Sequence, residues 1–295
     1  MSDNSQNNGE NLRTGILWML TTTLMFVLMD TCVKLLVANY PTLQVVWGRY
    51  FFQVVILCVV LAPRTATLIR TQSLKFQLLR SVFLLGATLC FFQSLNTLQI
   101  AEACAIMFSA PLIVTALAPL VLKEKVGIRR WISVLFGFAG AMIIIRPGAA
   151  TADASALWAL GGAACYACYQ ISTRALSSQD PVLTTLFYSA LLGAIAMSFI
   201  APIGFKTPDA MGWVLMAASG AFGTLGHFSM IKAFTQAEAS KVAPFSYSNL
   251  IWASIIGFAL FDTLPDVWTY VGATVIVMSG LYIAHREKTR KIASG

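Results

Sequence analysis

The sequence predicts an all-α integral membrane protein with ten transmembrane helices, arranged as a five-plus-five inverted repeat. Three observations support this prediction. The chain of 295 residues is 58% hydrophobic and only 11% charged, with a mean hydropathy of +0.75, whereas soluble domains carry about 25% charged residues. The apolar residues gather in runs of about twenty, the length at which a helix crosses the bilayer core. The pattern of the first half also recurs in the second.

The elements follow in chain order. Residues 1–12 are polar and rich in Asn and Ser, without the basic segment or cleavage site of a signal peptide. We therefore expect a disordered cytosolic tail there. Ten apolar runs follow, separated by short connections that leave no room for a soluble domain, and a basic cytosolic tail over 287–295 closes the chain. The predicted transmembrane helices cover 13–37, 43–62, 76–98, 102–122, 129–146, 155–175, 182–203, 211–235, 241–261 and 267–285.

Matching residues in the two halves indicate a duplication. The apolar segment 96–126 has Ala101-Glu102-Ala103 near its head, and the segment 234–268 has Ala237-Glu238-Ala239 in the same place. Chance similarity between apolar runs is the alternative explanation. Because five helices per copy is an odd number, the copies enter the membrane from opposite sides, as in secondary transporters whose substrate site lies near the midplane. At a nearly constant offset, Leu17-Trp18, Lys34 and Pro41 match Leu157-Trp158, Arg174 and Pro181, which gives repeats over 13–148 and 149–286.

Lysine and arginine set the predicted orientation. Cytosolic segments of membrane proteins carry an excess of these residues. With the N-terminus inside, the outer ends hold only Lys34, Arg146 and Lys206, and the even number of helices places both termini in the cytosol. The cytosolic segments then hold Arg13, Arg64, Arg70, Lys75, Arg80, Lys123, Lys125, Arg129, Arg130, Arg174, Lys241, Arg286, Lys288, Arg290 and Lys291.

The composition and motifs argue against several function classes. The net charge of +8 comes from basic residues in short connections, which fits membrane orientation and predicts no nucleic-acid partner. The six cysteines lie within or beside apolar runs, and the Cys165/Cys168 pair has no second pair or histidine cluster, so we expect helix packing there. No HExxH, GxSxG, Walker or GxGxxG arrangement occurs. We therefore expect no enzyme activity, no cofactor and no metal site.

Polar side chains at bilayer depth are the candidates for a substrate site. A charge there costs several kcal/mol unless it faces a partner or water. Asp30, Arg49 and His227 are predicted to recognise substrate charge or to be protonated, although Asp30 can also pair with Lys34 one turn away. A cavity with both charges and aromatic faces suits a zwitterionic or aromatic metabolite. The other residues predicted to line the cavity are Gln53, Gln93, Asn96, Tyr166, Tyr169, Gln170, Tyr247 and Trp252. As alternatives, the aromatic residues could lie in the aromatic belt at the membrane interface, and the polar ones could form interhelical hydrogen bonds.

Two acidic residues and two prolines have further candidate roles. Glu102 and Glu238 stand at predicted helix N-termini, where the helix dipole favours a carboxylate. Capping is their default explanation, and together with Asp30 they are also candidates for coupling to protons. Pro111 and Pro244 remove backbone donors inside apolar helices and are candidate hinges.

Five segments together carry a resemblance to a known family: WGRYFFQ (47–53), FFQSLNTLQIAEACAIMFSAPL (91–112), LKEKVGIRRW (122–131), GFAGAMIIIRPG (137–148) and IKAFTQAEASKVAPFSYSNLIWASIIGFALFDTLPD (231–266). They resemble the drug/metabolite transporter superfamily, specifically its EamA-type bacterial carriers. The similarity covers nearly the whole chain and extends to riboflavin and S-adenosylmethionine carriers of that superfamily. It implies a five-plus-five inverted repeat in the bacterial inner membrane, with a central cavity lined by the first four helices of each half. Phe261-Asp262 departs from the more usual Phe-Gly-Glu of the family.

The sequence thus predicts a secondary carrier that moves a small organic metabolite by alternating access. An amino acid or related zwitterionic or aromatic compound is the first expectation, and a riboflavin-like or S-adenosylmethionine-like substrate is the alternative. The direction of transport stays open. A channel, a membrane enzyme acting on lipid and a non-transporting scaffold are the other hypotheses. The expected partners are the small-molecule substrate and the lipid bilayer, and a homodimer is an open alternative to the monomer.

Overall fold

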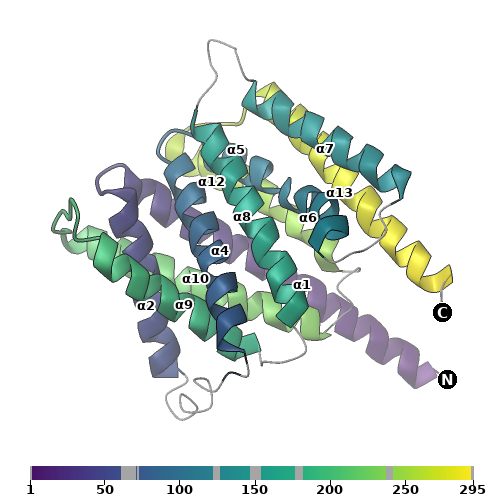
Figure 1. Cartoon of the computed structure of the whole chain (residues 1–295), viewed down its shortest axis with the longest axis horizontal. Helices are drawn as coiled ribbons and strands as arrows, with labels where there is room; N and C mark the ends of the chain where they lie inside the picture. Colours follow the sequence, from purple (N-terminus) through teal and green to yellow (C-terminus); the bar gives the residue numbers. More distant parts are fainter. Residues whose placement is uncertain are drawn as a thin grey trace.

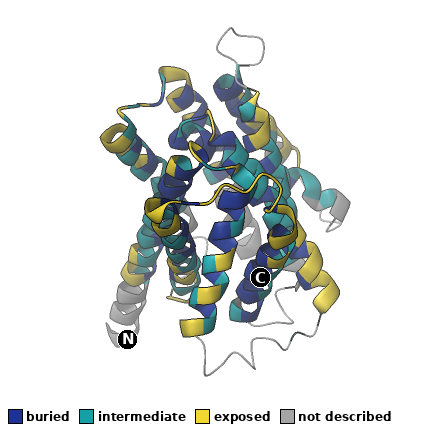
Figure 2. Ribbon diagram, turned by 90° about the vertical axis from the view of Figure 1, so that its left-hand side faces the viewer, coloured by how far each residue is buried: buried dark blue, intermediate teal, exposed yellow. Residues whose placement is uncertain are grey.

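The computed structural model describes residues 2–60, 71, 73–121, 127–146, 154–176, 182–236 and 242–293. Within these residues the regular structure is entirely helical and no strand occurs. The helices form one bundle, with buried residues in its middle and exposed residues on its outside (Figures 1 and 2). The elements are α1 (Ser2–Val37), α2 (Thr42–Val60), α4 (Leu74–Ser94), α5 (Ile100–Met107), α6 (Ala110–Val121), α7 (Ile128–Ile145), α8 (Ser155–Leu176), α9 (Val182–Ile200), α10 (Ala210–Gln236), η2 (Ala243–Tyr247), α12 (Ser248–Phe261) and α13 (Val267–Ala293).

The helices supply the apolar segments that a membrane protein requires. Among the described residues, six segments are long and apolar enough to cross a membrane, and one of these runs through α5 and α6. Shorter apolar helices lie in α7, in η2 with α12, and in α13. Together with α8 they correspond to the ten predicted segments. The many exposed large hydrophobic side chains of these helices, such as Phe136 and Phe199, are where acyl chains would lie.

The fourth and ninth apolar segments are interrupted helices. The fourth breaks at Phe108 and Ser109 between α5 and α6, two residues before Pro111. Proline lacks a backbone N–H and is accommodated in the first turn of a helix, so α6 starts anew there. The ninth begins as the short 3₁₀-helix η2, which contains Pro244, and continues as α12. The two hinge candidates therefore lie at these interruptions.

The two halves of the chain interlock. α1 packs against α10 and α12, α2 against α9 and α10, and α4 against α8 and α9. α6 packs on α8, α5 on α12, and α7 on α13. Each of these pairs joins a helix of the first half to one of the second. The predicted repeats are thus not separate globular domains, and the hydrophobic core runs continuously between them.

Glycines bring α7 and α13 together at the edge of the bundle, where the two helices lie side by side (Figure 1). A Cβ added to Gly140 would lie 2.8 Å from the carbonyl oxygen of Gly272, and one added to Gly272 would lie 2.5 Å from that of Gly140. Both distances are shorter than real Cβ contacts. The two backbones therefore approach closely only because neither residue has a side chain, a common device between membrane helices.

The first helix begins earlier in the structure than the sequence predicts. The sequence predicts disorder over 1–12, whereas α1 begins at Ser2 in the structure. Extending an existing helix requires no new nucleation, so a polar segment can continue a stable apolar helix.

A salt bridge joins the end of α7 in the first half to the residue before α13 in the second half. The Nη2 atom of Arg146 lies 2.6 Å from Oδ2 of Asp266, just before α13. Partial burial raises the pKa of Asp266, but hydrogen bonds from the Thr269 hydroxyl and backbone N–H, together with the Arg146 guanidinium, outweigh it and hold the pKa below its ordinary value.

Candidate functional site

The middle of the bundle contains charged and polar side chains that are almost completely removed from the surface. Asp30 of α1 is 4% exposed, Arg49 of α2 is 4% exposed, and Gln53 of α2 is 2% exposed. Arg49 and Gln53 are one turn apart on the same helix, so they share a face. Three predicted site residues are therefore buried within the bundle, at the depth where ionic groups need a functional or structural reason.

Arg49 contacts side chains of α2 and α4, and its Nε donor has no protein partner in the described chain. Its Nη1 atom donates to Thr88 Oγ1 of α4 at 3.2 Å, and its guanidinium lies 4.8 Å from the ring centre of Tyr50 and 5.6 Å from that of Phe92. The Nε atom is buried and has no hydrogen-bond partner in the described part of the chain. On the α10 side the neighbour is Gly223, where an added Cβ would lie 3.6 Å from Nε.

Asp30 is also incompletely hydrogen-bonded. Its Oδ2 accepts a long contact from the Cys104 thiol of α5, at 3.9 Å, while its buried Oδ1 has no partner among the described residues. The expected partner, Lys34, points elsewhere: its Nζ donates to the carbonyls of Leu95 and Leu98, both at 2.7 Å. Carbonyls at the C-terminal end of a helix attract a cation, which explains the difference.

A second set of incompletely bonded groups lies at the helix interruptions. Ser109 stands in the break between α5 and α6, and Asn249 and Trp252 lie in the first turns of α12. The buried Oγ of Ser109, Oδ1 of Asn249 and Nε1 of Trp252 have no hydrogen-bond partner in the described chain. Because more than nine in ten buried polar groups are normally paired, these atoms are available to a ligand or to water.

Aromatic rings accompany both interruptions. Phe108 of the first interruption lies against Tyr247 of the second, with ring centres 5.0 Å apart. On α8, Tyr166 and Tyr169 are stacked, with centres 5.5 Å apart and planes 20° from parallel. α5 connects these features, because it packs on both α8 and α12 and also contacts Asp30 through Cys104.

Arg80 is a buried charge that the sequence interpretation places wrongly. The orientation argument assigns it to a cytosolic connection, but α4 begins at Leu74, and Arg80 lies more than one turn inside it, 4% exposed. The signal was present in the sequence: Gln77, Ser81 and Thr88 share one face of α4 with it. Its guanidinium donates to four groups, Thr173 Oγ1 (2.7 Å) and Tyr169 OH (2.6 Å) of α8, and the Thr185 carbonyl (3.1 Å) and Ser189 Oγ (3.2 Å) of α9. We call Arg80 and these four residues the Arg80 cluster.

A second polar cluster joins the halves at the turns after α1 and α9. The Gln44 amide donates to the Lys206 carbonyl at 2.7 Å and accepts from the Lys206 backbone N–H at 2.9 Å. The Tyr40 hydroxyl donates to Asp209 Oδ1 at 3.0 Å. The backbone N–H of Gly212 and this hydroxyl hold the pKa of Asp209 below its ordinary value. We call Tyr40, Gln44, Lys206 and Asp209 the Gln44 cluster.

The remaining predicted residues are dispersed. Asn96 is exposed at the end of α4, where its amide donates to Thr42 Oγ1 (3.1 Å) and to the Gln93 carbonyl (2.9 Å). His227 of α10 is partly exposed and packs edge-on against Phe26, with ring centres 5.1 Å apart. Gln170 is a partly buried residue of α8. The structure does not bring Gln93 and Asn96 together with the buried groups.

The two acidic coupling candidates besides Asp30 have different outcomes. Glu102 accepts the backbone N–H of Gln99 at 3.0 Å, which caps the start of α5. Capping therefore explains its position, and coupling stays a prediction. Glu238 lies outside the described residues.

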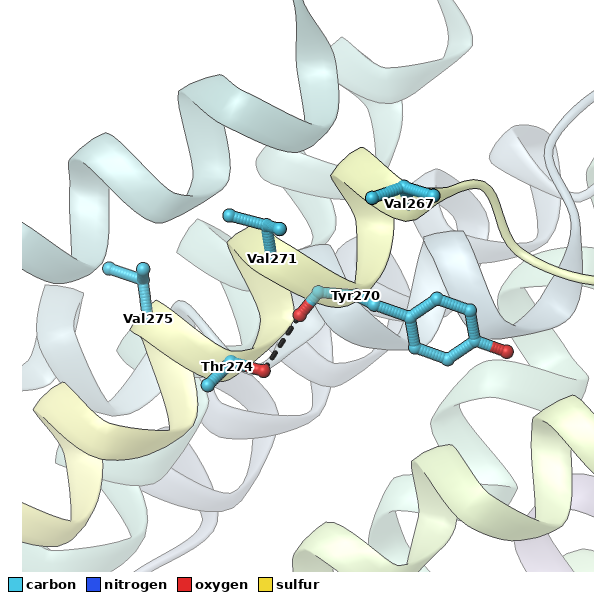
Figure 3. A pocket seen from close by; sticks show the side chains of 5 residues that line it. All are labelled: Val267, Tyr270, Val271, Thr274 and Val275. Atoms are coloured by element: carbon cyan, nitrogen blue, oxygen red, sulfur yellow. Dashed lines mark hydrogen bonds between the residues drawn. The ribbon is translucent and has the colours of Figure 1, made fainter.

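Two surface depressions lie away from these polar groups. One runs along α13, lined by Val267, Tyr270, Val271, Thr274 and Val275 (Figure 3). A neighbouring groove of about 570 Å³ lies between α7 and α13 and is mostly apolar. Both belong to the α7–α13 pair, where lipid chains would pack, so we do not place the substrate there.

Comparisons with known proteins agree with this architecture. The EamA-like transporter family matches residues 13–146 and 154–284. The chain is 32% identical over 286 residues to a riboflavin transporter of Vibrio cholerae, covering 92% of this chain and 93% of the relative. It is 26% identical over 275 residues to an S-adenosylmethionine uptake transporter of Rickettsia conorii, covering 93% and 94%. A protein crystal structure with 14% identity superposes with a TM-score of 0.65 over 93% of this chain and 98% of the other, so the fold is shared. With an all-helical membrane bundle and family matches in both halves, this chain is a membrane transporter and belongs to the EamA-like transporter family.

Proposed function

We propose that this protein is a secondary carrier that moves a flat, heterocyclic organic metabolite of the riboflavin or S-adenosylmethionine kind across the bacterial inner membrane. The carrying observation is the set of buried polar atoms that lack a protein partner. Asp30, Arg49 and Gln53 contribute one each from the first half, and Asn249 and Trp252 contribute one each from the second. An unpaired buried polar group costs about 1–3 kcal/mol, so a substrate that pairs with several of them gains affinity.

The relatives favour the alternative substrate over an ordinary amino acid. The names of the two reported relatives specify riboflavin and S-adenosylmethionine, and both molecules contain a planar ring system. The Phe108–Tyr247 pair offers aromatic faces at the two interruptions, next in the chain to Ser109 and close to Asn249. Aromatic faces bind planar rings by stacking.

The equivalent packing of the two halves supports an inverted repeat, a common basis of alternating access. If the five segments of the first half are matched in order to the five of the second half, α1 corresponds to α8, α2 to α9, and α4 to α10. The α1–α10 contact then becomes α8–α4, and the α2–α10 contact becomes α9–α4; both counterparts are present. The α2–α9 and α7–α13 pairs exchange with themselves. Two copies packed in this equivalent way can exchange conformations and open the site to one side or the other.

The two polar clusters suit the ends of such a pathway. The Arg80 cluster joins the start of α4 to α8 and α9, and the Gln44 cluster joins the end of α1 and the start of α2 to the turn before α10. The matching of the two halves described above converts the helices of the Arg80 cluster (α4, α8 and α9) into those of the Gln44 cluster (α10, α1 and α2). We propose that each cluster closes one end, the Arg80 cluster on the cytosolic side, with both chain termini in the cytosol.

Transport by purified protein in liposomes tests the proposal. We expect saturable uptake of radiolabelled riboflavin or S-adenosylmethionine, accelerated when the same unlabelled compound is preloaded inside. Asp30→Asn, Arg49→Ala and Trp252→Phe are expected to raise KM, while Lys75→Met, which changes an exposed cation near the start of α4, is expected to leave it unchanged. Uptake without acceleration by preloaded substrate would indicate a channel, and no uptake of either compound would refute the substrate assignment.

Coupling is measured in the same liposomes. A pH gradient that drives accumulation in the parent protein but not in Asp30→Asn would support Asp30 as the proton-coupling residue. His227 and Glu102 are tested in the same way, as the remaining described candidates.

A further inference from the structure

We infer that the substrate carries an anionic oxygen group, a carboxylate or a phosphate, and that Arg49 binds this group through its Nε side. The inference rests on the proposed function and specifies the substrate class of that site: it favours S-adenosylmethionine or a phosphorylated flavin over riboflavin itself, which has neither anionic group. It also assigns Arg49 as the residue that selects by charge.

The buried charges of the described chain do not balance. Three charged side chains are buried: Asp30, Arg49 and Arg80, each 4% exposed. A guanidinium remains protonated at any physiological pH, so both arginines keep their charge. Two cations therefore face at most one carboxylate, and the interior has an excess of one positive charge. Burying an unbalanced ion costs several kcal/mol, which a bound anion offsets.

The two buried arginines differ in how many of their hydrogen-bond donors are paired with protein groups. Arg80 donates to four oxygen atoms of α8 and α9, all of them neutral, and its Nε is among the bonded donors. Arg49 donates to one protein oxygen, the hydroxyl of Thr88, and its Nε has no partner in the described chain. Arg49 is therefore the buried cation with a donor available to a ligand.

The surroundings of Arg49 favour an oxyanion over a neutral acceptor. The described residues form no ion pair with Arg49, while Tyr50 and Phe92 place ring faces near its guanidinium. In this apolar setting the interaction with a charged acceptor is strengthened, and hydrogen bonds between ionised groups are about twice as strong as those between neutral ones. A substrate whose acceptor is a carboxylate or phosphate thus gains more than one whose acceptor is a carbonyl.

The neighbouring glycine keeps the donor side of Arg49 clear of protein side chains. An added Cβ at Gly223 would lie 3.6 Å from Arg49 Nε and 3.1 Å from Met29 Sδ. A methyl group there would occupy the position next to the free donor. Gly223→Ala is therefore expected to weaken binding of the anionic group while leaving the charge of Arg49 in place.

The test compares compounds that differ in the anionic group. The pairs are riboflavin 5′-phosphate with riboflavin, S-adenosylmethionine with its decarboxylated derivative, and tryptophan with tryptophan amide. Melting temperatures of the purified protein in detergent, recorded against ligand concentration, give an affinity for each compound. In at least one pair we expect the compound with the anionic group to bind at least tenfold more tightly than its counterpart without that group. The pair that shows this difference tells whether the site prefers a phosphate or a carboxylate.

Variants assign the discrimination to Arg49. We expect Arg49→Gln to reduce the ratio within the preferred pair to about one, Arg49→Lys to retain part of it, and Gly223→Ala to lower it. The matched control is Arg146→Gln, which removes the same charge from the outer turn next to Asp266 and is expected to leave the ratio unchanged.

Equal affinities within all three pairs, or an unchanged ratio in Arg49→Gln, would overturn the inference. So would the absence of a melting-temperature shift with all six compounds. Failure of the proposed function looks different: the anionic members would bind preferentially, yet none would be transported into liposomes. Conversely, transport of both members of a pair with equal KM would support a carrier and refute the charge selection.

Discussion

Replacing Arg80 with methionine removes the guanidinium that joins α4 to α8 and α9. Four hydrogen bonds are lost, to Tyr169, Thr173, Thr185 and Ser189. Hydrogen bonds to a charged group contribute about 1.5–3 kcal/mol each. A buried guanidinium also loses hydration worth several kcal/mol, so most of this gain is offset. We therefore take the net contribution as that of one such bond, about 1.5–3 kcal/mol.

If the Arg80 cluster closes one end of the pathway, this energy stabilises the closed conformation selectively. Because 1.4 kcal/mol corresponds to a tenfold change in an equilibrium constant, Arg80→Met should raise the population open at that end about ten- to a hundredfold. Ser81, which is 1% exposed and donates to Ser189 within the same interface, reports on this opening. In a cysteine-free background, the rate at which Ser81→Cys reacts with a maleimide is expected to rise by the same factor.

Two further variants serve as controls for the Arg80→Met experiment. Lys75→Met removes an exposed cation near the same end of α4 and is expected to leave the reaction rate unchanged. Arg80→Lys keeps the charge but not the planar array of donors, so an intermediate rate is expected. If Arg80→Met lowers the melting temperature without changing the Ser81→Cys reaction rate, the cluster is only structural and the assignment of a gate is wrong.

Three further predictions concern other parts of the molecule. Gly272→Ala places a methyl group against the carbonyl oxygen of Gly140, which cannot move aside as a side chain does, and should destabilise the protein by about 1–3 kcal/mol; an unchanged melting temperature would contradict the close α7–α13 contact. Because the pKa of Asp266 is lowered in the folded protein, the ionised carboxylate and its salt bridge with Arg146 stabilise the fold above the unfolded-state pKa of about 4, and this contribution declines as the pH falls through the folded pKa. Asp266→Asn should therefore lower the melting temperature at pH 7, and its difference from the parent protein should shrink as the pH is lowered below about 4; a difference that does not shrink would contradict this role. Trp252→Phe keeps an aromatic ring but removes the free Nε1 donor, so uptake assays should show a KM about threefold to tenfold higher with similar kcat, and an unaltered KM would remove Trp252 from the site.

The sequence allowed the apolar segments to be predicted, but not how they pack. Runs of about twenty apolar residues identify membrane helices because the bilayer core requires that length. The face of each helix that meets protein is harder to find, since lipid-facing and buried faces are both apolar. Val59 at 72% exposure and Val46 at 0% lie on the same helix, α2. The interlocking of the halves through α1–α10 and α4–α8 therefore emerged only from the structure.

Depth along a predicted helix identified some buried site residues but was not a complete guide, since His227 of α10 is partly exposed. Asp30, Arg49 and Gln53 lie in the middle of predicted helices, and the structure buries all three. Arg80 and Asn96 lie near predicted helix ends, where a polar residue fits either an interface or the interior. The choice depends on partners far along the chain: oxygen atoms of α8 and α9 surround Arg80, whereas Asn96 meets the nearby Thr42 and remains exposed. Spacing along one helix contains no information about such partners.

The distribution of hydrogen bonds fits the proposed carrier better than a stable channel. At the ends of the bundle, Arg80 and Gln44 donate to protein groups of the opposite half, so the proposed closure there needs no ligand. In the centre, Arg49 Nε and Trp252 Nε1 have no such partner in the described chain. A carrier needs both properties, since its ends must close around the substrate and its centre must gain energy only when the substrate is bound. A channel requires neither, because its pore stays hydrated while ions or solutes pass. We therefore expect mutations at the ends to alter the rate of exchange between conformations, and mutations in the centre to alter affinity.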